Sequence, residues 1–82
     1  MDAIRKGNYL NIIDNDDSRE EILISIGEIL DIEKIYENGD YIIRINIINR
    51  GSKYSCGEDF VCEDETEWKV LYEKIVRILG GE

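Results

Sequence analysis

The chain has 82 residues, 43% hydrophobic and 35% charged, and its 19 acidic and 10 basic residues give a net charge of −9. This length suits one core, so we expect a single domain over residues 1–82. The negative charge disfavours direct binding to nucleic acid or to an anionic membrane, because both kinds of binding depend on Lys and Arg. It favours a partner protein with a basic surface.

The N-terminal part of the chain predicts one strand followed by an acidic turn. Residues 1–7 contain no apolar segment of the kind that a secretory signal needs, so we expect a cytoplasmic protein. Residues 8–13 form a short apolar segment that predicts the first strand. The polar residues 14–19 predict a turn.

The segment from about 19 to 37 has two interpretations. As one helix it would end at Asn38-Gly39 and give the element order β-α-β-β-α. As two strands, over 22–26 and 30–37, it would bend at Gly27. The strands are favoured, because the segment is rich in β-branched isoleucine and a glycine inside a helix costs roughly 1 kcal/mol relative to alanine.

The next two segments predict a hairpin followed by a returning strand. Asn38-Gly39 supplies the positive φ angles of a tight turn. In the strand expected over 41–49, the odd positions from 41 to 47 are apolar, whereas Arg44 and Asn46 lie in the middle of the opposite face. A further strand is expected over 53–58.

The C-terminal segment 64–79 predicts an amphipathic helix. Asp64 is the expected N-cap and Glu67 lies three residues later, which is capping-box spacing. The apolar face consists of Trp68, Leu71, Tyr72, Ile75, Ile78 and Leu79. The expected fold is therefore α+β: a small twisted antiparallel sheet of four or five strands, as a meander or a partly closed barrel, with one helix packed on it.

The residue types give no basis for a catalytic, cofactor-binding or metal site, and we expect a binding protein rather than an enzyme. Histidine is absent, and the segment from Asp14 only imitates a calcium loop, because Arg19 replaces the required glycine and Ser25 the required glutamate. Cys56 and Cys62 have too few partners for a zinc site, so we expect buried thiols, with a disulfide as the alternative.

Acidic side chains gather in two clusters, and we expect them to bind the partner. Helix capping explains the later members of the first cluster but not its first three. We call this first cluster the acidic shoulder; it consists of Glu58, Asp59, Glu63, Asp64, Glu65 and Glu67. The secondary cluster consists of Asp14, Asp16, Asp17, Glu20 and Glu21.

Two functions fit these clusters. In the first, the protein is an inhibitor that docks carboxylates into the basic, nucleic-acid-binding surface of a host protein, such as a defence nuclease. In this it resembles small acidic accessory proteins of phages and mobile elements. In the second, the protein is an interaction module that acts through a sheet edge or as a homodimer, and its acidic faces serve only solubility.

One run, rich in isoleucine, also resembles part of a known family; it consists of Ile24, Ile26, Ile29, Ile32 and Glu33. Between residues 24 and 58 the chain is similar to the FlbD-like small proteins, which implies a compact strand meander and no particular site. The chain differs in lacking a proline before the hairpin and in its long helix.

Overall fold

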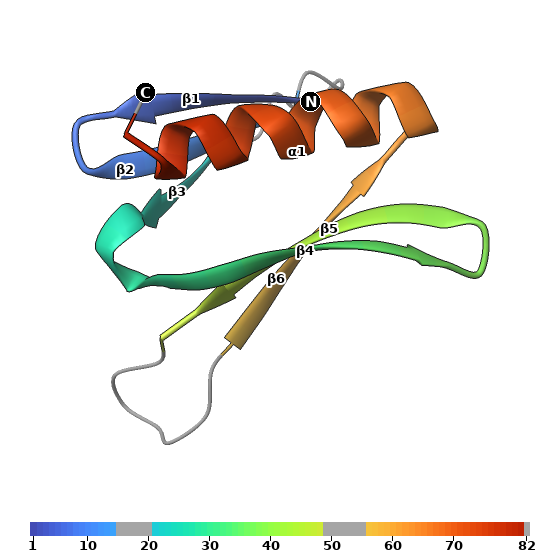
Figure 1. Cartoon of the computed structure of the whole chain (residues 1–82), viewed down its shortest axis with the longest axis horizontal. Coiled ribbons are helices and arrows are strands. Elements are labelled where there is room, and N and C mark those ends of the chain that lie inside the picture. Colours follow the sequence, from blue (N-terminus) through green and yellow to red (C-terminus); the bar gives the residue numbers. More distant parts are fainter. Residues whose placement is uncertain (15–20, 49–55, 82) are drawn as a thin grey trace.

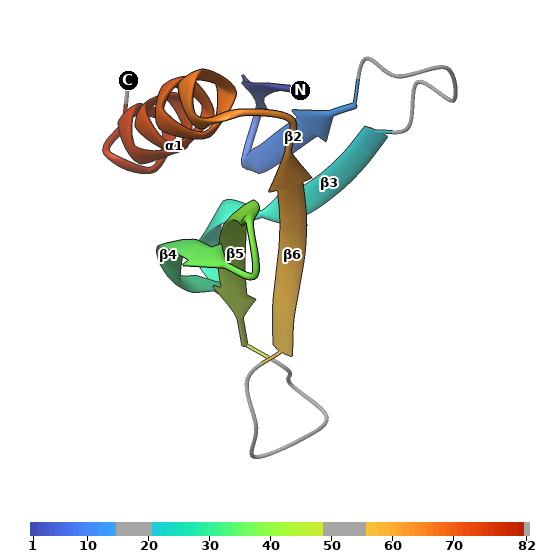
Figure 2. The ribbon, with the colours of Figure 1, turned by 90° about the vertical axis from the view of Figure 1, so that its right-hand side faces the viewer.

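The computed structural model describes residues 1–14, 21–48 and 56–81, which form two antiparallel sheets and one helix (Figure 1). The first sheet has the strand order β1 (Asp2–Lys6), β2 (Tyr9–Ile13), β3 (Glu21–Ser25). The second has the order β4 (Ile29–Glu37), β5 (Asp40–Ile47), β6 (Cys56–Cys62). Helix α1 (Glu65–Leu79) follows β6 and lies against β1 and β5 (Figure 2).

The α+β class with antiparallel strands and a C-terminal helix is confirmed, but a single sheet of four or five strands is wrong. Each sheet has three strands, and in the described part of the chain they do not close into a barrel. The alternative helix over 19–37 is also wrong, because residues 21–37 form β3, β4 and a short 3₁₀ turn at Ile26–Glu28. This turn contains Gly27, and the predicted bend there is what divides the strands between two sheets.

Strand β1 is an element that the sequence did not predict. It pairs with β2 through a two-residue loop, Gly7-Asn8, in which Gly7 has a φ of +60°. Its side chains alternate between the two faces of the sheet: those of Ala3 and Arg5 lie on the core side, and that of Ile4 lies on the other side. The apolar periodicity that identifies a half-buried strand is therefore missing from β1.

The predicted hairpin is confirmed with small changes in its boundaries. Asn38 and Gly39 have φ angles of 52° and 82°, as a two-residue loop between β4 and β5 requires. Strand β5 ends at Ile47 rather than at residue 49. Strand β6 runs to Cys62 instead of ending at residue 58, and residues 53–55 lie outside the described residues.

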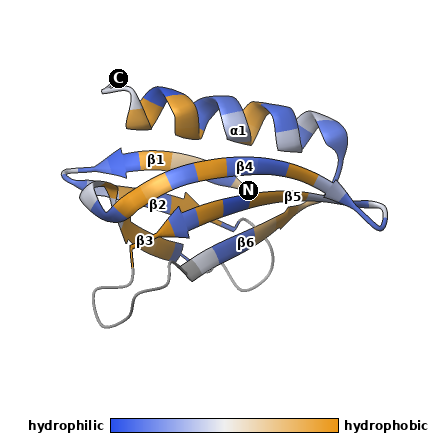
Figure 3. Cartoon of the chain, turned by 60° about the horizontal axis from the view of Figure 1, so that its bottom comes forward, coloured by the Kyte–Doolittle hydropathy of each residue, from blue (hydrophilic) through white to orange (hydrophobic). Residues whose placement is uncertain are grey.

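The core lies where the two sheets and the helix meet. Apolar and polar residues alternate in the second half of β5, and α1 carries an apolar stripe toward the sheets (Figure 3). The buried apolar side chains come from all three layers: Ala3, Leu10, Ile12 and Ile24 from the first sheet, Ile43, Ile45, Phe60 and Cys62 from the second, and Leu71, Ile75 and Ile78 from α1.

The first half of α1 is fixed to the second sheet by Trp68. Its indole N–H donates to the carbonyl oxygen of Ile42 at 3.0 Å, and its ring lies 5.1 Å from that of Tyr41. The ammonium of Lys34 lies over the rings of Trp68 and Tyr72, at 5.1 and 5.3 Å. These contacts set the rotation of the helix and thereby decide which of its side chains face outward.

One buried polar side chain interrupts the first sheet. Asn11 on the central strand β2 is fully buried, and its amide nitrogen and oxygen have no hydrogen-bond partner among the described residues. Its cross-strand neighbours are Ile4 and Leu23, both partly exposed. A buried amide without partners costs about 1–3 kcal/mol, so the sheet is less stable than its apolar content suggests.

Candidate functional site

The acidic shoulder follows the chain from β6 into α1. Glu58 and Asp59 lie on β6, the next two members lie in the connection, and Glu65 and Glu67 lie in the first turn of the helix. All are exposed except Glu67, which is half-buried. The strand extends further than the sequence predicted, so Asp59 lies on the sheet together with Glu58 rather than on a loop.

Much of this charge is used to begin the helix. Asp64 is the N-cap, and its carboxylate accepts a hydrogen bond from the backbone N–H of Glu67 at 2.8 Å. The Glu67 carboxylate in turn accepts from the backbone N–H of Glu63 at 3.0 Å. Glu65 forms an ion pair with Lys69 at 3.0 Å, one turn later. These contacts stabilise the first turn of α1 and need no partner protein.

The N-terminal amino group brings members of the two acidic clusters together. It lies 3.1 Å from the Glu67 carboxylate. Burial lowers the pKa of this amino group, but the hydrogen bond to Glu67 and the charges of Glu67, Asp14 and Glu63 raise the pKa more, so it lies above its ordinary value. Asp14 of the secondary cluster therefore acts at the same place as the shoulder.

The rest of the secondary cluster is only partly described. Glu21 begins β3 and lies 3.9 Å from the ammonium of Lys6. Asp16, Asp17 and Glu20 lie outside the described residues.

Asp59 is neutralised across the sheet. Its two carboxylate oxygens accept hydrogen bonds from the Arg44 guanidinium at 2.7 and 3.1 Å, and Glu33 lies 4.0 Å from the same group. The Arg44 hydrogen bond lowers the pKa of Asp59. Among the described residues, only Glu58 and Glu63 of the shoulder have side chains without a hydrogen bond or ion pair.

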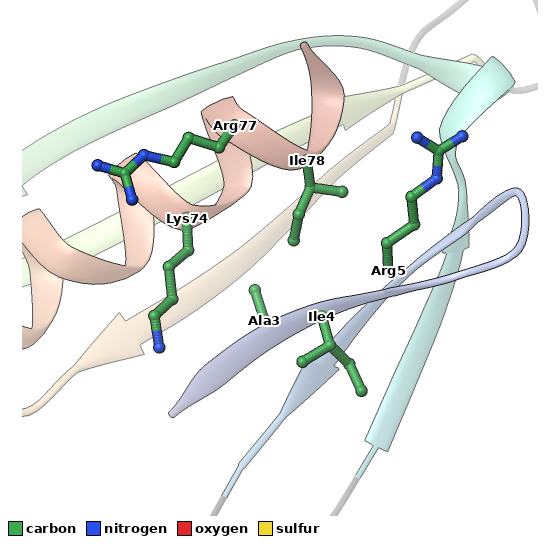
Figure 4. A pocket seen from close by; sticks show the side chains of 6 residues that line it. All are labelled: Ala3, Ile4, Arg5, Lys74, Arg77 and Ile78. Atoms are coloured by element: carbon green, nitrogen blue, oxygen red, sulfur yellow. The ribbon is translucent and has the colours of Figure 1, made fainter. Parts of the chain in front are cut away.

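A second candidate site, which the sequence did not predict, lies between β1 and α1. It is an open groove with a volume of about 370 Å³, which we call the β1–α1 groove. Ile78 and Ala3 point toward each other across it and form an apolar floor (Figure 4). Its lining consists of Ala3, Ile4 and Arg5 from the strand and Lys74, Arg77 and Ile78 from the helix.

The polar lining of the groove is basic, although the protein is acidic. Three of the ten Lys and Arg residues line it. The Lys74 ammonium binds the Asp2 carboxylate at 2.7 Å, and the Arg5 Nε donates to the carbonyl oxygen of Gly7 at 2.9 Å. Arg77 has no hydrogen bond or ion pair from its side chain within the described ranges. The groove thus has an excess of positive charge next to an apolar floor.

The groove also follows an unpaired strand edge. Among the described strands, β1 pairs only with β2. Lys6 and Tyr9 flank the two-residue loop and form a hydrogen-bonded pair. Because hydrogen-bonded and non-hydrogen-bonded pairs alternate along an antiparallel ladder, the backbone N–H and C=O groups of Ala3 and Arg5 point away from β2. The Ala3 N–H accordingly donates to the Asp2 carboxylate at 2.8 Å. The backbone groups of Arg5 face the open edge.

The sequence held a partial signal for this groove. Lys74, Arg77 and Ile78 have the spacing of one helix face, and Arg5-Lys6 forms a short basic run near the start of the chain. The missing information was β1 itself, because without that strand nothing placed Arg5 beside the helix.

The cysteines do not form the alternative disulfide. Cys62 is a free, buried thiol, and burial raises its pKa to about 11. Cys56 stands at the opposite end of the seven-residue strand β6, which at about 3.3 Å per residue is too far for an S–S bond. Over the described ranges, no group of three or more Cys, Asp or Glu side chains has an arrangement that could hold a metal ion. No helix there is long and apolar enough to cross a membrane.

Comparison of the chain with protein-family models finds no match. Comparisons with curated proteins and with solved structures also find none.

Proposed function

We propose that this protein is a protein-binding module, not an enzyme, and that it adds an extended segment of a partner to the free edge of β1 in the β1–α1 groove. The observation that carries the proposal is the coincidence of an unpaired strand edge, an apolar floor and three cations. Each of these features alone is common on protein surfaces, but together they are the parts of a peptide site.

The backbone of β1 supplies the affinity in this proposal. An exposed strand edge is a template for another strand, because its outward N–H and C=O groups have no partner. In strand addition these groups bind the backbone of the incoming segment, and pockets for alternate side chains give specificity. Here Arg5 offers both backbone groups, and the helix forms a wall along one side with Ile78 at its base.

The proposal is tested by removing one backbone donor. A library of displayed extended peptides is selected on the full chain, and the selected peptides are then measured against Arg5→Pro and Arg5→Ala. Proline is tolerated on an edge strand where its nitrogen faces outward. Arg5→Pro should abolish binding while Arg5→Ala retains part of it, because only the first variant loses the N–H. The selected peptides should also slow hydrogen exchange at the Arg5 amide.

Equal binding to the Arg5→Pro variant, checked for native folding by circular dichroism, would refute strand addition at β1. So would peptides that perturb the amide resonances of the acidic shoulder and leave those of Arg5 and Ile78 unchanged.

A second candidate function is carried by the unpaired carboxylates of the acidic shoulder. Glu58 and Glu63 are exposed, and Glu63 acts on the same amino group as Asp14. In this function the protein is an inhibitor, of phage or mobile-element origin, that docks these carboxylates on the basic, nucleic-acid-binding surface of a host protein.

The test of this second function uses Glu58→Gln combined with Glu63→Gln. This pair of changes spares the Arg44 ion pair and the helix cap. Partners captured from the host should bind the double variant more weakly and with a flatter salt dependence, and nucleic acid should compete with the unmodified protein. An unchanged affinity and an unchanged salt slope would exclude charge docking at the shoulder.

A further inference from the structure

We infer that the β1–α1 groove selects acidic segments, and that Asp2 occupies the carboxylate subsite of the groove when no partner is bound. The inference rests on the proposed addition of a strand at β1, and it names the chemistry of the segment that is added.

The subsite consists of two donors that already hold a carboxylate. One is the backbone N–H of Ala3, which faces the free edge of β1, and the other is the ammonium of Lys74 on the helix wall. The Asp2 carboxylate accepts from both, at 2.8 and 2.7 Å. A hydrogen bond with an ionised partner is roughly twice as strong as a neutral one, so this pair of donors forms a favourable carboxylate position.

The other cations extend the preference along the groove. Arg77 has no ion pair with a described residue, and Arg5 uses only its Nε on the Gly7 carbonyl. Three cations against the single Asp2 carboxylate leave an excess of two positive charges at the groove. A segment with alternating acidic and apolar side chains would place carboxylates at these cations and apolar groups at Ile78. A fatty acid would fill the apolar floor but would leave the Arg5 backbone groups unused.

Asp2 therefore competes with the partner. An incoming strand needs the Ala3 N–H, and its carboxylate needs Lys74, so Asp2 must leave both before the segment is fully seated. The competing Asp2 carboxylate is charged at neutral pH, and the hydrogen bond from Lys74 lowers its pKa, so it stays charged further into the acid range. Removing the charge of Asp2 should therefore strengthen binding of an acidic segment.

The experiment uses three peptides with blocked ends, in which valine alternates with Glu, Gln or Lys. Blocking removes the terminal carboxylate, so only side chains are compared. Binding to the full-length protein is measured by fluorescence anisotropy. The Glu peptide should bind at least about tenfold more tightly than the Gln peptide, which corresponds to 1.4 kcal/mol, and the Lys peptide most weakly. Lys74→Gln should remove the preference for Glu over Gln.

Asp2→Asn and Asp40→Asn form a matched pair, because both exchange one aspartate carboxylate for an amide. Asp2→Asn should raise the affinity for the Glu peptide by about tenfold, the lower end of the scale of one hydrogen bond to a charged group. Asp40→Asn, at the exposed start of β5 and outside the groove, should change it by less than about twofold, the scale of a screened surface charge.

The outcomes separate this inference from the function on which it rests. If the three peptides bind equally and all protect the Arg5 amide, strand addition stands and the acidic preference is wrong. If Asp2→Asn weakens binding, or changes it no more than Asp40→Asn does, Asp2 is a structural ion-pair partner and does not occupy a ligand subsite. If no peptide protects the Arg5 amide, both proposals fail.

Discussion

Replacing Ile75 by alanine tests the rotation of α1, on which both candidate sites depend. Ile75 is fully buried in the middle of the helix, where the two sheets and α1 meet. Truncating such a side chain to alanine costs about 2–5 kcal/mol, from lost burial and the cavity that remains. An 82-residue domain has a total stability of about 4–12 kcal/mol, so the variant should lose a large part of it. The adjacent Val76 is 45% exposed, and Val76→Ala should change stability by less than about 0.5 kcal/mol.

The assay is urea unfolding followed by the fluorescence of Trp68, the single tryptophan. With a slope of about 1–2 kcal/mol per molar urea, Ile75→Ala should lower the midpoint by roughly 2 M, and Val76→Ala should leave it nearly unchanged. If Ile75→Val is used because the alanine variant unfolds, the expected loss is about 0.5–1.5 kcal/mol. Equal effects at the two positions would refute the helix rotation, and Lys74 and Arg77 would then not line the groove.

Three further predictions concern the sheets and the thiol. Gly39→Ala should lower the free energy of unfolding, measured by thermal unfolding, by about 1 kcal/mol or more, because the φ of Gly39 is +82°. Gly27→Ala is the control and should be nearly neutral, because Gly27 has equally open space around it and no positive φ. Equal losses in the two variants would contradict the turn geometry. Asn11→Leu should raise the free energy of unfolding by about 1–3 kcal/mol, because it replaces an unpartnered buried amide, and a loss would show that the amide has a partner. The pKa of the Cys62 thiol is raised by burial from 9.0 to about 11, so the unfolded chain releases this proton first and stability should fall as the pH rises from 9 to 11. Cys62→Ala should flatten that fall in pH-dependent urea titrations, and an unchanged slope would contradict it.

Local patterns predicted those parts of the fold in which every inward position is apolar. Strand β5 is identified by the alternation around Ile43 and Ile45, and α1 by the 3.6-residue period through Leu71 and Ile75. In each element one face is apolar and the other is mainly polar, which is what makes the period visible. Strand β1 lacks this contrast, since Arg5 lies on its core side. The division into two sheets was also not predicted. The sequence indicates a bend at Gly27, but it does not show which strands pair with β3 and β4.

The candidate sites differ in the same way. Six carboxylates within ten residues are visible as composition, but their partners come from tertiary structure: Asp59 meets Arg44 through the β5–β6 register, and Glu67 meets the N-terminus. The β1–α1 groove unites residues from opposite ends of the chain, and the Asp2–Lys74 pair spans 72 positions. No local pattern contains that information.

The charge distribution along α1 has two explanations, and Arg5 separates them. The helix dipole favours acidic residues at the N-terminus and basic ones at the C-terminus, so Glu65, Lys74 and Arg77 are all in positions that stability alone would select. The helix dipole does not explain the position of Arg5, because Arg5 lies on β1, where it is exposed on the core side of the edge strand. If the basic groove served only the helix, Arg5→Ala would alter nothing beyond the small cost of a surface change, about 0.5 kcal/mol. If the groove binds acidic segments, the same variant should keep its unfolding midpoint and yet lose affinity for the Glu peptide, and that separation of stability from binding is what a binding site requires.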